Sequence, residues 1–316
     1  MPSSPSLELF GRVPGVRLRR DEPMSRHTTL RLGGPAELWA EPESDHALAE
    51  LLRLAREERV PVTVIGGGAN VLVRDEGIPG LTIHLGHRSF FQSRRTPAGL
   101  WAGAGLSLEW LIKAASEQGL AGLEFLTGVP GRVGGAVWMN AGTRDDAGRM
   151  RSMADVVESV QVMGRDGRQR YLSAEQMGFR YRGTGLRDEI ILGAEFRLEP
   201  DDPDRIEQRI KALWDTKRRT QDWSAPSAGC MFKNPSSDRS AGWMIDQAGL
   251  KGVRVGGMQI SPRHANFMIH VERATAADAL ALMETARQRV HRQFGIWLEP
   301  EIRILPPPAL QGEGQP

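Results

Sequence analysis

The chain is poor in cysteine and has no long apolar run. Its 316 residues include a single cysteine, Cys230, so no disulfide can form within the chain. A disulfide-stabilised scaffold is therefore excluded, and the lone thiol, which fits a reducing compartment, is available for chemistry. The 41 basic and 39 acidic residues nearly cancel, so the overall charge gives little attraction for nucleic acid or an anionic membrane. An anionic ligand has to be sought in local sites.

The amino-terminal stretch lacks the features of a targeting signal. In residues 1–23 the arginines are interrupted by prolines, acidic residues and glycines, and no apolar segment of signal-peptide length is present. Nowhere does an uncharged apolar run reach the roughly 18 residues that a membrane-spanning helix needs. We therefore expect a cytoplasmic protein without membrane insertion and without a nucleic-acid partner. The proline-rich, polar residues 306–316 predict a disordered tail.

What the chain does contain is an α+β pattern. Apolar residues recur at helical spacing over 44–58 and 106–118, and Gly119 ends the second of these helices. Short β-rich runs separated by glycine, proline or turn residues predict strands over 62–65, 71–73, 81–85, 156–163 and 190–198, with a hairpin turn at 165–167.

The composition changes at residues 199–203, which form an acidic connector that contains two prolines. We place a domain boundary after Pro203, where Asp204 can cap a basic amphipathic helix over 205–219. A second long helix is predicted over 276–294, with Thr275 as its N-cap and Gly295 as its stop.

A first glycine run, Gly66, Gly67, Gly68, Ala69 and Asn70, separates two predicted strands. A Rossmann fingerprint would feed a helix, and a P-loop would continue with Lys and Ser or Thr; neither pattern is present. What remains is a series of backbone N–H groups without side chains, which can close on a pyrophosphate. A tight turn without a ligand is the competing interpretation.

A second glycine run, over residues 128–142, favours a phosphate-bearing ligand over a tight turn without one. The stretch is too rich in glycine for an efficient helix or strand, and such stretches suit a close approach of the backbone to a bound group. A third candidate, 27–34, includes Thr29. Together the runs predict a large phosphate-bearing cofactor, without choosing among dinucleotides. The candidate residues of the second run are Gly128, Pro130, Gly131, Gly134, Gly135, Asn140 and Gly142.

The order of these motifs resembles the UDP-N-acetylenolpyruvoylglucosamine reductase family over residues 28–304. The most specific parts are TTLRLGGPA, GGGAN, GLAGLEFLTGVPGRVGGAVWMNAG, YRGT, AGCMFKNP, AGWMIDQAGLKG, QISPRHANF and LEPEIR. The resemblance implies an α+β fold: a vanillyl-alcohol-oxidase-like (PCMH-type) FAD-binding domain of two α+β subdomains, followed by an α+β substrate-binding domain. The expected organisation is an arm at 1–24, an FAD-binding domain at 25–203 (subdomains 25–85 and 86–203), a substrate-binding domain at 204–305, and the tail.

The resemblance also implies the reaction. NADPH would reduce bound FAD, whose N5 would pass a hydride to the vinyl carbon of UDP-N-acetylglucosamine enolpyruvate. Protonation of the neighbouring carbon would give UDP-N-acetylmuramate, a precursor of peptidoglycan. The expected cofactors are therefore FAD and NADPH, with no metal.

Three positions match catalytic residues of the family. Arg182 corresponds to the arginine that binds and polarises the substrate carboxylate, a task suited to a planar guanidinium. Glu301 corresponds to the active-site acid; Glu299 would share its face of a strand, and only the family motif selects Glu301. Considered without the family, each would be read as an exposed surface charge.

Cys230 stands where most members of the family have the serine assigned as proton donor. A thiol with an ordinary pKa of about 8.5 is protonated at neutral pH and can therefore donate. Nearby Lys233 or a helix N-terminus could instead lower that pKa and leave a thiolate. The simpler alternative is a buried small hydrophobic residue.

Further positions match substrate contacts of the family. The chain departs from the family at Asp222, where Gln-Pro is usual, and at Ala69, Thr184 and His270. The stretch between Arg182 and Cys230 is too short for the tyrosine-bearing insertion of some members, which places the chain in the shorter, type II branch. The candidate substrate-binding residues are Arg218, Gln221, Lys233, Asn234, Gln259 and His264.

Other interpretations stay open at this point. His84 and His87 suggest a metal, but no cysteine or acidic residue lies at ligand spacing. An FAD-dependent sugar or alcohol oxidase would often tether its flavin through His or Cys, and no such residue lies beside the glycine runs. A nucleotide-sugar sensor without turnover would have no need of Arg182, Cys230 and Glu301 together.

Overall fold

The computed structural model describes residues 6–236 and 239–307, and the chain forms two compact units. The first unit takes in residues 1–20, 38–67 and 80–221, and the second takes in 21–37, 68–79 and 222–316. Each unit has its own hydrophobic core and mixes helices with strands. The predicted α+β class is confirmed.

A four-stranded sheet, most of which belongs to the first unit, has the order β1 (Val16–Pro23), β2 (Pro35–Pro42), β5 (Ile78–His84) and β3 (Val62–Ile65). Strands β3 and β5 are parallel, with Val62 opposite Leu81. Helix α2 (Asp45–Glu57) begins at Ser44, whose side chain accepts a hydrogen bond from the N–H of Ala47. Its buried residues Leu48, Leu51 and Leu52 recur at helical spacing, as the sequence predicts.

The larger sheet of the first unit is antiparallel. Its order is β12 (Gln169–Ser173), β11 (Val157–Met163), β13 (Ile190–Arg197), β7 (Gly99–Gly103) and β6 (Ser93–Thr96). Helix α3 (Leu108–Glu117) confirms the prediction for this stretch. The second glycine run nevertheless forms a short helix, α4 (Val133–Trp138), which the glycine content argues against. Burial of Val133, Ala136 and Val137 stabilises it despite its two glycines.

Helix α5 (Pro203–Thr220) departs from its predicted start. Its N-cap is Asp202, which accepts from the N–H of Asp204, and Pro203 takes the first helical position, where its missing N–H is harmless. The helix also belongs to the first unit, although the sequence places a domain boundary before it. Ile206 and Leu213 are buried, and Arg209 donates to the Glu124 carboxylate at 2.7 Å. The predicted domain limits themselves stay a prediction.

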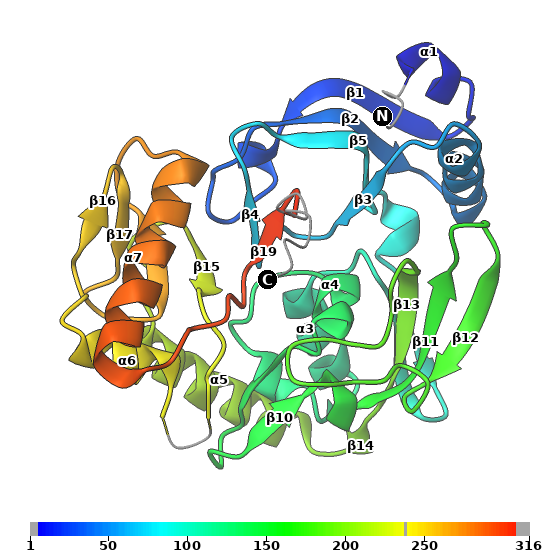
Figure 1. Ribbon diagram of the computed structural model, residues 1–316. Helices are drawn as coiled ribbons and strands as arrows, with labels where there is room; N and C mark the ends of the chain where they lie inside the picture. The colour runs from blue at the N-terminus through cyan, green and yellow to red at the C-terminus, as the bar shows by residue number, and fades with distance from the viewer. Residues whose placement is uncertain (1–5, 237–238, 308–316) are drawn as a thin grey trace. The chain divides into compact units, whose positions relative to one another are not determined.

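The second unit is built on an antiparallel sheet. Its order is β15 (Ser227–Cys230), β18 (Phe267–His270), β17 (Met258–Ile260) and β16 (Arg254–Val255). Helix α7 (Ala276–Phe294) lies against β16 and β17 and contacts α6 (Ala241–Gln247), as Figure 1 shows. Strand β4 (Val71–Val73) joins this unit by pairing in parallel with β19 (Arg303–Leu305).

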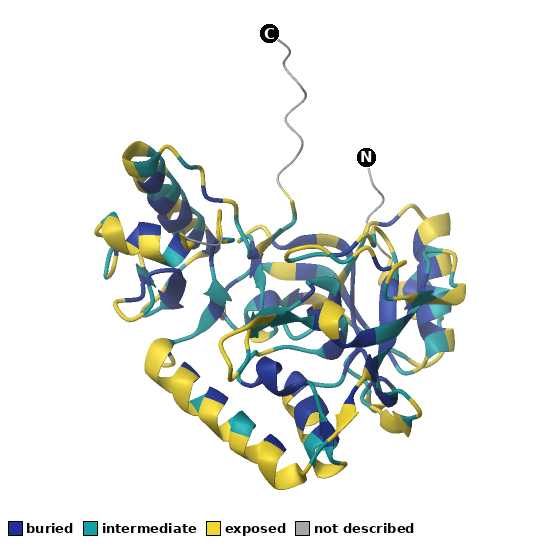
Figure 2. Cartoon of the chain, turned by 90° about the horizontal axis from the view of Figure 1, so that it is seen from below, coloured by how far each residue is buried: buried dark blue, intermediate teal, exposed yellow. Residues whose placement is uncertain are grey.

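Helix α7 begins and ends where the sequence predicts. Thr275 and Asp278 form a capping box, and Gly295 follows the helix with a φ of 70°. Asp75 reinforces the start, because its two carboxylate oxygens accept from the N–H groups of Ala276 and Ala277 at 2.8 and 2.9 Å. Buried residues line one side of the long helices and exposed residues the other (Figure 2).

The remaining elements are short. Strand β1 begins inside the predicted amino-terminal arm, and of the predicted tail only Pro306 and Pro307 lie within the described residues. No helix in the described ranges is long and apolar enough to cross a membrane. The short elements are α1 (Leu7–Phe10), η1 (Met24–Arg26), η2 (Arg88–Phe90), β8 (Leu120–Ala121), η3 (Glu124–Leu126), β9 (Gly142–Arg144), β10 (Met150–Ser152), η4 (Met153–Asp155) and β14 (Glu199–Pro200).

Candidate active site

The first and second glycine runs meet in the first unit. A Cβ at Gly67 would lie 3.2 Å from the Cα of Gly131 and 3.6 Å from the Cγ of Arg132, so a side chain at Gly67 would force the two runs apart. Gly66 lies beside the same arginine: a Cβ at Gly66 would be 4.0 Å from the Cβ of Arg132. Two segments that are distant in sequence thus present their backbones together, as a phosphate-binding cradle requires.

The third run meets the continuation of the first run in the second unit. Gly68 has a φ of +61°, and a Cβ there would lie 1.9 Å from the carbonyl oxygen of His27. The N–H of Thr29 donates to the Gly68 carbonyl at 3.1 Å, and its hydroxyl lies 3.4 Å from the same oxygen. Ala69 follows, half-buried, before Asn70.

The two glycines of helix α4 have different surroundings. A Cβ at Gly134 would lie 2.9 Å from the Cβ of Ala104, so packing inside the protein accounts for this glycine. Gly135 is exposed, and beyond its own helix a Cβ there would meet no atom of the described residues within 4 Å. Since neither packing nor a positive φ requires glycine at 135, its surface is open to a bound group. The open surface at Gly135 fits a diphosphate-bearing cofactor that passes over α4.

Among the other predicted residues of the second run, Asn140 and Gly142 contact other parts of the protein. Asn140 has a φ of 43°, donates from its amide to the carbonyl of Arg180 at 3.0 Å and accepts from the N–H of Ala154 at 2.9 Å. Gly142 lies in β9, where a Cβ would approach the carbonyl oxygen of Arg151 at 2.5 Å. Pro130 is exposed beside Gly131, whose φ is +130°.

A buried lysine that sequence reasoning missed supports the start of the second run. Lys217 donates to the carbonyl of Thr127, and its Cδ would lie 3.0 Å from a Cβ at Gly128. Burial lowers the pKa of Lys217 to about 8. The hydroxyl of Thr127 is buried and finds no hydrogen-bond partner within the described part of the chain, an orphan atom that also fits a nearby ligand.

Arg182 lies at the tip of a tight turn in the first unit. Arg180 and Gly183 exchange backbone hydrogen bonds of 2.9 and 3.1 Å, and Asn140 holds the Arg180 carbonyl. Arg182 has a φ of 56°, a left-handed conformation that is unfavourable for a residue with a side chain and is typical of functional sites. Its guanidinium lies 5.1 Å from the ring centre of Tyr181.

Cys230 and Glu301 lie on neighbouring segments of the second unit. Cys230 ends β15 and is half-buried. The next residue, Met231, accepts at its carbonyl from the N–H of Glu301 at 2.8 Å. The carbonyl of Glu301 in turn accepts from the side-chain amide of Asn70 at 3.0 Å, so the first glycine run holds this segment in place.

Asn266 fixes the other side of the Cys230 segment, and the sequence offers no signal for this role beyond its place in the motif QISPRHANF. Its buried side chain accepts from the N–H of Phe232 at 3.0 Å and donates to the Phe232 carbonyl at 2.8 Å. Its own carbonyl accepts from the N–H of Met231 at 2.8 Å. The backbone after Cys230 is therefore bound on both sides.

The structure distinguishes the two glutamates of LEPE. The exposed Glu299 forms an ion pair with Lys233, and its carbonyl accepts from the Lys233 N–H at 2.9 Å. Glu301 is half-buried instead. The predicted substrate contact Lys233 therefore already has an acidic partner on the surface.

The predicted substrate residues Arg218 and Gln221 close helix α5. Arg218 is exposed, with its guanidinium 5.6 Å from the ring centre of Trp214, and Gln221 is the C-cap. In the second unit, Gln259 donates to the carbonyl of Gly252 at 3.0 Å, and Asn234 accepts from the N–H of Ala241 at 3.1 Å, where α6 begins.

Asp222, the departure from Gln-Pro, organises the loop around His264. Its buried carboxylate accepts from the Ser224 hydroxyl at 2.6 Å and from the Ser261 hydroxyl at 2.5 Å. Burial alone would raise the pKa of Asp222, but these hydrogen bonds outweigh it and lower the pKa. Ser261 accepts in turn from the N–H of His264 at 3.1 Å. Burial lowers the pKa of His264, which favours its neutral form.

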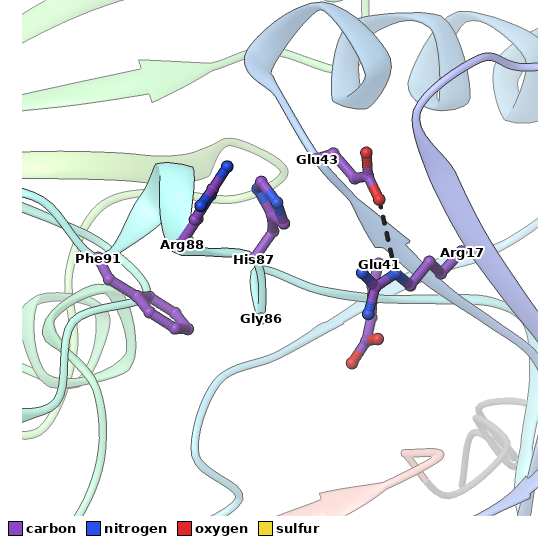
Figure 3. Close-up of a pocket in the computed structure, with 7 residues that line it drawn as sticks. All are labelled: Arg17, Glu41, Glu43, Gly86, His87, Arg88 and Phe91. Carbon is purple, nitrogen blue, oxygen red and sulfur yellow. Dashed lines mark ion pairs between the residues drawn. The ribbon is translucent and has the colours of Figure 1, made fainter.

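A pocket of about 550 Å³ also lies in the first unit (Figure 3). Phe91 lines one side of it, and the ion pair of Arg17 with Glu43, at 3.5 Å, lies on the other. No cluster of three or more His, Cys, Asp or Glu suited to a metal ion occurs in the described ranges. The remaining residues of the pocket lining are Glu41, Gly86, His87 and Arg88.

Two family models match the chain. The model described as "FAD binding domain" matches residues 36–173, which contain the first and second glycine runs. The model described as "UDP-N-acetylenolpyruvoylglucosamine reductase, C-terminal domain" matches residues 221–305, which contain Cys230 and Glu301.

Whole relatives agree with these models. A UDP-N-acetylenolpyruvoylglucosamine reductase of Desulfosudis oleivorans is 42% identical over 92% of this chain and 95% of that protein. One of Rubrobacter xylanophilus is 43% identical over 91% and 95%. The crystal structure of a UDP-N-acetylenolpyruvylglucosamine reductase (MurB) from Thermus caldophilus is similar with a TM-score of 0.78 and 36% identity, covering 92% of this chain and 100% of that one. The chain belongs to the UDP-N-acetylenolpyruvoylglucosamine reductase family and is an FAD-dependent oxidoreductase.

Proposed function

We propose that the protein reduces UDP-N-acetylglucosamine enolpyruvate to UDP-N-acetylmuramate in the cytoplasm, with NADPH as reductant. The observation that carries the proposal is the segment after Cys230, which is bound by Asn266 on one side and by the backbone N–H of Glu301 on the other. Two groups able to handle a proton are thereby held on adjacent segments, within a chain whose family shares this order of motifs.

FAD, which the backbone of Gly66, Gly67 and Gly131 would hold, would supply hydride transfer from NADPH to the vinyl carbon of the substrate. The protein must then stabilise the negative charge that develops toward the substrate carboxylate. Arg182 is proposed to bind that carboxylate, because its strained turn presents a guanidinium able to donate two parallel hydrogen bonds.

Cys230 is proposed to deliver the proton to the carbon next to the carboxylate. One hydride and one proton add across the double bond, which balances the reaction and leaves NADP+ and a lactyl ether. The thiol loses its proton in this step and has to regain it from solvent or from a neighbouring acid. Glu301, half-buried beside the Cys230 segment, is proposed to fill that relay or to assist charge stabilisation.

The substrate's diphosphate and sugar are proposed to bind Arg218, Gln221, Lys233, Asn234, Gln259 and His264. Arg218 and Lys233 supply positive charge, and the others supply hydrogen-bonding groups. The Asp222 network supports the turn that carries His264, so the aspartate replaces the usual proline by a different means of fixing the loop.

Variants of Cys230 test the assignment in D₂O with NADPH and the enolpyruvyl sugar. The wild-type product should carry deuterium at the carbon next to the carboxylate. Cys230→Ser, the matched control, should retain substantial activity because a hydroxyl can replace the thiol. Cys230→Ala should slow turnover by roughly 10²- to 10⁴-fold, the contribution typical of a general acid. An Ala variant as fast as the wild type would remove Cys230 from this role.

A further inference from the structure

Arg132 lies where the two glycine runs of the first unit meet. Its Cγ would be 3.6 Å from a Cβ at Gly67, and it follows Gly131 directly in the second run. Its guanidinium donates to the carbonyl of Gly105 and lies 5.0 Å from the ring centre of Phe91. Arg132 is thus a cation held between the first and second glycine runs, whose backbone carries no side chain at Gly67 and Gly131.

The charge of Arg132 lacks a matching carboxylate within the described residues, where no ion pair to it occurs. Glu41 acts on Arg132 through its charge, but it forms its ion pair with Arg19, at 3.3 Å. Burial lowers the pKa of Arg132. A half-buried guanidinium without a counter-ion is unfavourable, and an anionic ligand would compensate it.

We propose that Arg132 is the counter-cation of the FAD diphosphate in this chain, with its guanidinium donating to phosphate oxygens between the runs 66–67 and 131–135. A guanidinium suits this task because it presents several donors in one plane and keeps its charge when partly desolvated. The hydrogen bond to Gly105 and the contact with Phe91 orient it, so little side-chain freedom is lost on binding. This inference rests on FAD binding and not on the proposed reaction.

Flavins of different length separate this role from a structural one. We would measure the affinity of the full-length protein for FAD, FMN and riboflavin by quenching of flavin fluorescence. Arg132→Met should weaken FAD binding by roughly 10- to 100-fold, the loss expected for a charge-assisted hydrogen bond. Riboflavin, which has no phosphate, should bind the variant and the wild type alike. Arg132→Lys should keep more FAD affinity than the Met variant because it keeps the charge.

Arg94→Met provides the matched control, since Arg94 also lies over an aromatic ring, at 4.3 Å from the ring centre of Trp101, but on strand β6. It should leave all three affinities unchanged. Unchanged FAD affinity in Arg132→Met, or an equal loss for riboflavin, would overturn the proposal. If the Met variant fails to fold, the wild type decides: its FAD affinity should fall with added NaCl while its riboflavin affinity does not, and a salt-independent FAD affinity contradicts the role.

Discussion

The two units hold their candidate functional residues in different ways. In the first unit, the candidate cradle is backbone: a Cβ at Gly67 would lie 3.2 Å from the Cα of Gly131, and Gly135 leaves the surface of α4 uncovered. In the second unit, the candidate catalytic segment is fixed by side-chain amides, with Asn266 on one side and Asn70 on the other. A cofactor can be bound by shape and backbone dipoles, whereas a proton donor has to be held at one position.

The difference makes opposite substitutions harmful in the two regions. Adding atoms should damage the candidate backbone cradle, and removing polar atoms should damage the candidate catalytic segment. Three predictions test this contrast, in order of decreasing effect.

Asn266→Ala should have the largest effect, because it leaves the buried N–H and carbonyl of Phe232 without their partners. We expect a loss of roughly 2–5 kcal/mol in the free energy of unfolding, measured by denaturant titration. Turnover should fall as well, since Cys230 precedes this segment. The control is Gln288→Ala, which removes an exposed amide from the surface of α7 in the same unit. Equal stabilities for the two variants would contradict the role of Asn266.

Lys217→Met tests the buried ammonium that binds the Thr127 carbonyl at the start of the second glycine run. The measured quantity is the pH dependence of the free energy of unfolding. The pKa of Lys217 is about 8 in the folded protein and 10.5 in its ordinary state. Between these values the unfolded chain binds more protons, so the wild type should gain stability relative to Lys217→Met as the pH rises, by roughly 3 kcal/mol in total. Below pH 8 the difference in unfolding free energy between the wild type and Lys217→Met should be constant. Parallel unfolding free energies from pH 7 to 10.5 would show that the lysine is not buried in this way.

The glycines of α4 give the smallest but most selective effect. Gly134→Ala should destabilise the protein by roughly 1–3 kcal/mol because of the 2.9 Å approach to Ala104. Gly135→Ala should instead raise stability by roughly 0.5–1 kcal/mol, as alanine favours a helix, yet weaken FAD binding. Thermal unfolding and flavin affinity report the two quantities separately. A Gly135→Ala variant with unchanged FAD affinity would place the cofactor elsewhere.

Local signals account for what could be predicted from the sequence. Thr275 and Gly295 act within one helical turn of the helix that they begin or end, so the sequence predicts their roles. The meeting of Gly67 with Gly131 depends on packing between distant segments. The glycine content suggested a loop at α4, but burial of Val133 and Val137 compensates for the poor helix propensity.

Long-range partners explain the residues that were missed. Lys217 binds a carbonyl 90 positions away in the chain, and Asn266 binds Phe232 across 34 positions. Nothing in the local sequence distinguishes either from a surface residue. The sequence marks Asp222 only as a departure from the family, and its hydrogen bonds with Ser224 and Ser261 depend on how the chain folds.

In the proposed reaction, this FAD protein passes reducing equivalents from NADPH to an enolpyruvyl sugar nucleotide. Its most direct test follows the flavin absorbance of the purified protein in the absence of oxygen. NADPH should bleach the absorbance, and addition of UDP-N-acetylglucosamine enolpyruvate should restore it while UDP-N-acetylmuramate forms. A reduced protein that this substrate leaves bleached, but that oxygen or another acceptor reoxidises, would contradict the account.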